Sequence, residues 1–251
     1  MKPGPNLDRL FLALQFLTII PIRKDAPVDE VALGKSGAFF PLVGFIIGLI
    51  LLIASKFFPV FFPVPISDLL VLAVLVVLTG GIHLDGFCDT IDALASRRNR
   101  EEALDIMRDS RLGAMGAMGL FLLLLLKYLT LTNLPPGPKS YLLLLMPALG
   151  RYSITHMAFF LPYARTGPGK GRPFTDYIEA RELLIALAQV LLISIVVLQF
   201  TGIVILLLIL LFTFAWGFYV NRRIGGITGD ILGATSEMNE VLVLLLGSIL
   251  T

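Results

Sequence analysis

Long apolar stretches recur along the whole chain, separated by short polar connections. Several of them approach or exceed about 18 residues, the length that a helix needs to cross the roughly 30 Å hydrocarbon core of a membrane. Buried elements of a soluble domain rarely give such stretches repeatedly. The pattern predicts an all-α, polytopic membrane bundle with seven apolar segments, at residues 38–57, 64–82, 114–132, 140–161, 183–199, 202–220 and 231–250.

Both ends of the chain carry polar interruptions that affect the expected number of spans. The last segment contains Glu237 and Glu240 and could be re-entrant, so we expect about six to seven membrane-spanning helices. The stretch from Leu10 to Ile22 is amphiphilic and is broken by polar residues and by Pro21. A signal peptide is an alternative there, but no small-residue cleavage site follows. We therefore predict an additional N-terminal helix that is interfacial or re-entrant.

The composition agrees with a membrane protein. The chain has 251 residues, of which 57% are hydrophobic and 15% are charged, and its mean hydropathy is +0.89. Soluble domains carry about 25% charged residues. The net charge of +2 is too small to suggest nucleic acid as a partner. The single cysteine, Cys88, excludes an internal disulfide, and residues 1–251 read as one integral membrane domain.

The basic residues predict how the chain is oriented. With the N-terminus in the cytoplasm, 16 of the 20 Lys and Arg residues fall in cytoplasmic loops, and the opposite side keeps only Lys56 and Lys139. Cytoplasmic loops of membrane proteins carry such an excess of positive charge. The pattern predicts a multi-pass membrane protein with its charged loops in the cytoplasm. It also places nearly every carboxylate on the cytoplasmic side, with Asp68 as the plain exception.

The most informative polar stretch follows the second apolar segment. If this stretch is helical, Asp85, Asp89 and Asp92 stand at positions i, i+4 and i+7 and share one face. Like charges at this spacing destabilise a helix by roughly 0.2–0.5 kcal/mol per pair, so something should offset the repulsion. Magnesium takes oxygen ligands and is typically held by one or two carboxylates together with substrate phosphates. The spacing indicates a site for such a cation.

A second acidic helix is predicted directly afterwards. Asn99 can cap its N-terminus with Glu102 three residues on, and Asp105 and Asp109 again stand four residues apart. We expect the two acidic helices to face each other across a cleft, with arginines that suit phosphate because guanidinium binds its oxygens in a bidentate fork. Four other charged residues of the stretch are more typical of a solvated loop: Arg98, Arg100, Glu101 and Glu102.

Two glycine-rich loops lie on the same predicted side. The segment 165–173 is basic and resembles a phosphate-contacting loop without the Walker spacing. The segment 225–230 opens the last apolar segment, where backbone amides could meet an anion; a flexible turn is the alternative. Arg151 and His156 lie inside the fourth segment. They are costly in lipid and should face an interior cavity, where either a substrate or an internal ion pair would explain them.

The run from Gly80 to Asp92 closely resembles the signature of the cobalamin synthase family, the adenosylcobinamide-GDP ribazoletransferases. The likeness covers nearly the whole chain and includes four further stretches, 14–21, 40–44, 106–113 and 225–234. It implies a magnesium-dependent, multi-pass enzyme of the cell (inner) membrane that joins adenosylcobinamide-GDP to α-ribazole, or to its 5′-phosphate, and releases GMP. The lipid bilayer is the other expected partner, and a homo-oligomer stays open.

The resemblance also suggests roles for individual residues. We expect Asp85, Asp89 and Asp109 to hold Mg²⁺, and Asp92, with His83 nearby, to act in catalysis by accepting a hydroxyl proton of ribazole. The residues that we expect to contact the substrates are Arg108, Ser110, Arg111, Gly113, Lys170, Arg172, Thr228 and Asp230. Residues 83–113 would then form a cytoplasmic catalytic loop.

Two other classes of protein fit parts of the sequence. A CDP-alcohol phosphotransferase also uses spaced aspartates to displace a nucleoside monophosphate, but the order of aspartates and glycines differs here. A transporter can use intramembrane acids and broken helices, but it would place ionisable groups near the membrane midplane. In this chain the ionisable groups gather at one interface, which favours an enzyme.

Overall fold

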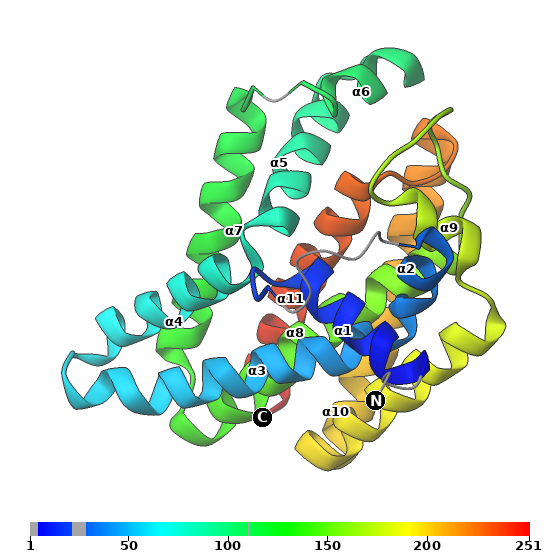
Figure 1. Ribbon diagram of the computed structural model, residues 1–251. Helices are drawn as coiled ribbons and strands as arrows, with labels where there is room; N and C mark the ends of the chain where they lie inside the picture. The colour runs from blue at the N-terminus through cyan, green and yellow to red at the C-terminus, as the bar shows by residue number, and fades with distance from the viewer. Residues whose placement is uncertain (1–4, 22–28, 110) are drawn as a thin grey trace.

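The computed structural model describes residues 5–21, 29–109 and 111–251, and all regular elements in these ranges are helical (Figure 1). The helices are α1 (Pro5–Leu17), α2 (Glu30–Ser36), η1 (Gly37–Phe39), α3 (Phe40–Phe57), η2 (Phe58–Val60), α4 (Val64–Thr79), α5 (Ile82–Ala95), α6 (Arg100–Ile106), α7 (Ala114–Asn133), α8 (Pro136–Phe160), α9 (Arg172–Tyr177), α10 (Ala180–Ile224) and α11 (Gly229–Leu250).

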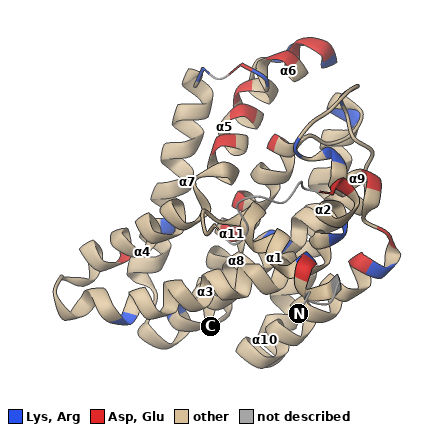
Figure 2. Ribbon diagram, in the orientation of Figure 1, with Lys and Arg blue, Asp and Glu red and all other residues tan. Residues whose placement is uncertain are grey.

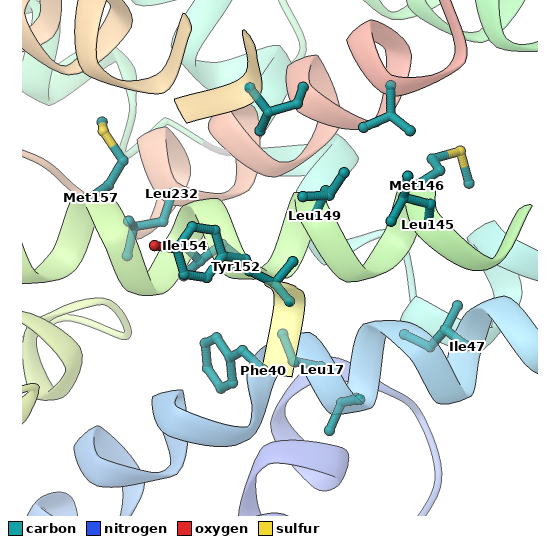
Figure 3. Packing of buried hydrophobic residues seen from close by; sticks show 14 of the residues in the cluster. Leu17, Phe40, Ile47, Leu145, Met146, Leu149, Tyr152, Ile154, Met157 and Leu232 are labelled. Atoms are coloured by element: carbon teal, nitrogen blue, oxygen red, sulfur yellow. The ribbon is translucent and has the colours of Figure 1, made fainter. Parts of the chain in front are cut away.

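Helix α8 is the centre of the bundle and packs against α3, α10 and α11. Figure 3 shows its side chains Leu145, Leu149 and Tyr152 between the α3 ribbon on one side and the α11 ribbon on the other. Two glycines of α3 allow the helices to approach closely. A Cβ atom on Gly44 would lie 2.3 Å from the carbonyl oxygen of Pro147, so only glycine fits there. Small residues at helix contacts are the usual means of packing in membranes.

The all-helical, polytopic class predicted from the sequence is confirmed. Four stretches are long and apolar enough to cross a membrane: Glu30–Val60, α7, α10 and α11. Helices α4 and α5 give a fifth only if this pair, bent by 90°, is counted as one span. Because α5 carries three aspartates and lies at the end of the molecule where charged residues gather (Figure 2), we place α5 outside the apolar segments.

Each of the seven predicted segments coincides with helix, but four or five candidate spans are fewer than the expected six to seven. The predicted segments 183–199 and 202–220 both belong to α10, which is interrupted at Gln199 (φ 49°, ψ −127°). Helix α4 has only 16 residues. The amphiphilic N-terminal stretch becomes α1, a helix of 13 residues that packs against α2 and α3.

Four buried charged residues connect α7, α8 and α11. Lys127 donates to Glu237 over 2.6 Å and also contacts Glu240, which in turn pairs with Arg151. All four side chains are at most about 5% exposed. Two positive and two negative charges therefore neutralise one another inside the bundle. Of the two explanations that the sequence left open for Arg151, the structure shows the internal ion pair.

Candidate active site

The acidic helix α5 starts at a sharp corner made by two glycines. Gly80 and Gly81 adopt left-handed backbone angles (φ 61° and 66°), which favour glycine, and the chain turns by 90° between α4 and α5. Helix α5 then packs on the N-terminal part of α11. A Cβ atom on Gly86 would lie 2.8 Å from the backbone of Asp230, so the absence of a side chain at Gly86 brings the two acidic elements together.

A cavity of about 70 Å³ lies where α5, α9 and α11 meet. Its lining includes His83 and Asp85 of α5, Lys170 of the basic loop and Asp230 of α11. Phe16 and Phe174, whose ring centroids are 4.8 Å apart, add an aromatic wall. Four of the residues predicted to form the site therefore share one cavity, although they come from three distant parts of the sequence.

His83 is the most buried polar residue of this cavity. His83 is only 4% exposed, and among the described residues its Nδ1 atom has no hydrogen-bond partner. A buried polar atom without a partner is rare in folded proteins and commonly marks a place for a water molecule or a ligand. The geometry agrees with a role of His83 in the site.

Asp89 of α5 is partly buried and lies close to other carboxylates. Burial raises the pKa of Asp89 to about 6, and the neighbouring charges of Asp85, Asp230 and Asp92 act in the same direction. The guanidinium of Arg165 opposes this shift. The prediction that α5 is helical is confirmed, and the expected repulsion between its carboxylates is present. A cation at this position would relieve the repulsion.

Asp92 has a structural role that the sequence did not reveal. Its Oδ2 atom accepts a hydrogen bond from the Gly113 amide and its Oδ1 atom accepts one from the Gly116 amide, both 2.8 Å long. Asp92 thus caps the N-terminus of α7 from another helix. A Cβ atom on Gly113 or Gly116 would lie 2.3–2.4 Å from this carboxylate, so both glycines make room for it. Gly113 therefore has a packing role, and its contact with a substrate stays a prediction.

The structure does not bring Asp109 to Asp85 and Asp89. Asp109 pairs with Arg111 instead, with a 2.5 Å contact and further hydrogen bonds, and this pairing lowers the pKa of the Asp109 carboxyl. In residues 5–21, 29–109 and 111–251, no three metal-ligating side chains are grouped closely enough to hold an ion by themselves. Ser110 lies outside the described residues, and Arg108 is exposed at the end of α6.

The two glycine-rich loops are joined to each other. Tyr163 pairs with Ile227 in a short parallel bridge, in which the Ala164 amide donates to the Ile227 carbonyl over 2.8 Å. Gly226 permits this approach, because a Cβ atom there would lie 2.3 Å from the carbonyl oxygen of Pro162. Thr228 is fully buried and caps α11, so its side chain supports the loop from within.

The predicted substrate-binding residue Arg172 shapes the basic loop. It donates to the Gly167 carbonyl over 2.7 Å and pairs with Asp176 at 3.1 Å. Lys170 of the same loop lines the cavity. The loop therefore presents Lys170 to the site and uses Arg172 to hold its own backbone.

Sequence reasoning missed two arginines of the site. Arg100 is exposed, as expected, but it also donates to the carbonyl oxygens of Ile224 and Ala164 at 2.8 and 3.0 Å and so ties α6 to the residues that directly precede both loops. Arg165 pairs with Asp230 at 2.9 Å. No local pattern identifies either contact, since each partner lies more than 60 residues away in the sequence.

These features define a class: a helical membrane protein with a cavity lined by acidic and basic side chains at the charged end of an apolar bundle. A family model described as cobalamin-5-phosphate synthase matches residues 9–248. The chain belongs to this family.

Curated relatives are similar over almost their full length. A protein of Clostridium acetobutylicum named adenosylcobinamide-GDP ribazoletransferase is 38% identical over 237 residues, which cover 94% of each chain. Relatives of the same name from Acetivibrio thermocellus (36% identity, 96% of this chain and 97% of the relative) and Geotalea daltonii (39% identity, 94% of each) agree. No solved structure matches the chain.

Proposed function

We propose that this protein is an adenosylcobinamide-GDP ribazoletransferase, which transfers adenosylcobinamide phosphate from adenosylcobinamide-GDP to α-ribazole or its 5′-phosphate and releases GMP. The main support is the cavity that joins His83, Asp85, Lys170 and Asp230 in a chain matched to the family from residue 9 to residue 248. Residues 83–113 form the acidic part of the site. We place it on the cytoplasmic side because the basic residues gather in the same loops.

The donor set of α5 fits magnesium together with a substrate. Asp85 and Asp89 are one helical turn apart, and the pKa of Asp89 is raised by burial first and then by the neighbouring carboxylates, whose charge a divalent cation would neutralise. Two carboxylates, with water and substrate phosphates, are the usual magnesium ligands in phosphoryl-transfer sites. Bound magnesium would neutralise charge on the pyrophosphate as GMP departs. In this proposal Asp109 is not a ligand, because Arg111 occupies it.

The chain's own residues then position the substrates and remove a proton. A ribose hydroxyl of ribazole attacks the phosphorus next to cobinamide, its O–P bond forms, and the bond to the GMP phosphate breaks. We assign the hydroxyl proton to the imidazole of His83, because this side chain lines the cavity and its Nδ1 is without a partner among the described residues. Asp92 is the weaker candidate, since both of its oxygens accept backbone hydrogen bonds.

Lys170 supplies positive charge at the cavity, where the pyrophosphate would lie. Arg108 is exposed on the connection that follows α6, and we propose it as a second contact to the phosphates. Guanidinium and ammonium groups stabilise the charge that develops during phosphoryl transfer without needing a covalent role. The predicted contact with Arg111 is less favoured because Asp109 holds its guanidinium.

One assay separates this function from its nearest alternative. The detergent-purified protein is incubated with magnesium, α-ribazole and adenosylcobinamide-GDP, and release of GMP is measured; a parallel reaction with a CDP-alcohol and a lipid acceptor reports CMP. GMP release that depends on both substrates and stops when EDTA removes the metal is expected. CMP release without GMP release would identify a CDP-alcohol phosphotransferase instead.

Variants test the residue assignments. Asp85→Asn and Asp89→Asn should lower turnover by at least about 100-fold while the protein stays folded, since each loses a metal-ligating charge. Glu101→Gln is the matched control, because Glu101 is exposed on α6 away from the cavity. Near-normal turnover of purified Asp85→Asn would refute the metal assignment. His83→Gln should reduce kcat more than it changes KM.

A further inference from the structure

A groove of about 560 Å³ lies between the last turns of α8 and the second half of α10. Most of its lining is aliphatic or aromatic, and it includes Phe160 of α8 and Leu211, Phe214 and Phe218 of α10. The groove is distinct from the cavity of the candidate active site, which lies where α5, α9 and α11 meet.

The side chains of the groove are exposed on the outside of the bundle. Phe160, Leu211 and Phe214 are 59%, 64% and 69% exposed. They lie on or beside α10, which is long and apolar enough to cross a membrane. An apolar surface of this kind marks a place that another apolar molecule covers. In a membrane, that molecule is either a lipid or a second protein chain.

The length of the groove matches one leaflet of the bilayer. From Leu210 to Asn221, which both line it, an α-helix rises by about 16 Å. This is close to half of the roughly 30 Å hydrocarbon core. Helix α10 ends at the charged end of the molecule (Figure 2), where the Ile224 carbonyl accepts a hydrogen bond from Arg100. The groove therefore runs from the membrane interior to the surface, as one acyl chain does.

A positive charge lies at the surface end of the groove. The guanidinium carbon of Arg222 is 4.4 Å from the centroid of the Phe218 ring, which lines the groove. Arg222 is exposed, and no carboxylate in the described part of the chain forms an ion pair with it. The exposed amide of Asn221 is next to it. Guanidinium and amide donors together suit a phosphate oxygen.

The deeper part of the groove offers no such charge. The Thr213 hydroxyl donates to the Ile209 carbonyl over 2.7 Å and accepts from Asn239 over 3.0 Å, so it is bonded within the protein. The His156 ring packs against Phe160, with their centroids 4.7 Å apart. The distribution of charge thus follows that of a phospholipid, with a charged head at the surface and hydrocarbon below it.

We infer that the groove binds one acyl chain of an anionic phospholipid, whose phosphate lies against Arg222 and Asn221. The site is independent of the reaction proposed above, because it requires only that α10 lies in a membrane. A lipid bound there would bridge α8 and α10, the two helices that precede the glycine-rich loops 165–173 and 225–230.

The test compares two lipids that share their acyl chains and differ in headgroup charge. The delipidated full chain in detergent is titrated with dioleoyl-phosphatidylglycerol or dioleoyl-phosphatidylcholine, and bound lipid is measured by native mass spectrometry. The Kd for phosphatidylglycerol should be lower by about 5-fold or more, as expected for one arginine at an anionic headgroup. Arg222→Gln should remove this difference by weakening phosphatidylglycerol alone. Arg181→Gln, at an exposed arginine near the start of α10, is the matched control.

A second variant tests the part of the groove that would hold the acyl chain. Leu211→Trp places a larger ring in the groove, so it should weaken binding of both lipids several-fold without changing the melting temperature. Leu192→Trp is the matched control, because Leu192 is also 64% exposed on α10 and does not line the groove.

Three results would overturn the inference. The first is an equal Kd for the two lipids in the unmodified protein, and the second is an unchanged Kd for phosphatidylglycerol in Arg222→Gln. The third is a dimer of the unmodified protein that Leu211→Trp dissociates, because a second copy of the chain would then occupy the groove.

Discussion

Removing the carboxylate of Glu240 tests whether the buried charges hold the bundle together. Glu240 accepts contacts from both Lys127 and Arg151, and the three side chains are at most 1% exposed. Glu240→Gln keeps the shape of the side chain but leaves the buried group with one excess positive charge, since only Glu237 remains as a counter-charge.

The magnitude follows from this burial. A contact between unit charges at about 4 Å contributes roughly 4 kcal/mol at an effective dielectric constant of 20, and Glu240 makes two such contacts. The hydration that the carboxylate regains on unfolding offsets part of this. Breaking a buried pair by removing one partner typically costs about 3–5 kcal/mol. For a chain of this size the melting temperature should fall by about 6–20 °C.

The assay is reversible unfolding in mixed detergent, followed by circular dichroism. Arg98→Gln is the control, because its ion pair with Glu102 is exposed and should contribute no more than about 0.5 kcal/mol. The double variant Arg151→Met/Glu240→Gln should recover part of the loss, since it leaves Lys127 and Glu237 as a neutral pair. An unfolding free energy within 1 kcal/mol of the unmodified protein for Glu240→Gln would refute the reasoning.

Three further substitutions test the supports of the site. Asp92→Asn should lower the unfolding free energy by about 1–3 kcal/mol, because an amide cannot accept both hydrogen bonds from α7; loss of turnover at unchanged stability would instead favour Asp92 as the base. Gly113→Ala should destabilise α7 by a similar amount in the same unfolding experiment, since its Cβ atom meets that carboxylate. Arg100→Gln frees the carbonyl oxygens of Ile224 and Ala164, so the KM for the donor should rise several-fold; an unchanged KM would contradict the tethering role.

Local signals in the sequence were sufficient for the elements of the acidic segment. The acidic stretch is helical as expected, so Asp85, Asp89 and Asp92 stand at i, i+4 and i+7 of α5, and the capping residue Asn99 begins α6 by accepting a hydrogen bond from the Glu102 amide over 2.9 Å. Both signals act within one or two helical turns. For the same reason the apolar segments, whose pattern is also local, coincide with helices throughout.

Contacts between distant segments could not be predicted in this way. Asp92 looks like its neighbours on α5, but it caps a helix that starts 22 residues later. Asp109 has the chemistry of a metal ligand, but its carboxylate forms an ion pair with Arg111, two residues away. Arg100 resembles its solvated neighbours, yet it finds two carbonyl oxygens 64 and 124 residues away. In each case the charge of the side chain can be read from the sequence, but the group that it contacts depends on how the chain folds.

Charged side chains are paired differently in the site and in the interior of the helix bundle. Inside the bundle, where an unpaired charge would be most costly, two positive and two negative side chains neutralise one another: Lys127, Arg151, Glu237 and Glu240. At the charged end Asp85 and Asp89 share a helical face without such balance, and Arg165 is already engaged by Asp230. In the proposed function, this imbalance is the reason that Asp85 and Asp89 bind a cation. The substrate held by that cation would carry negative charge of its own, as a pyrophosphate does.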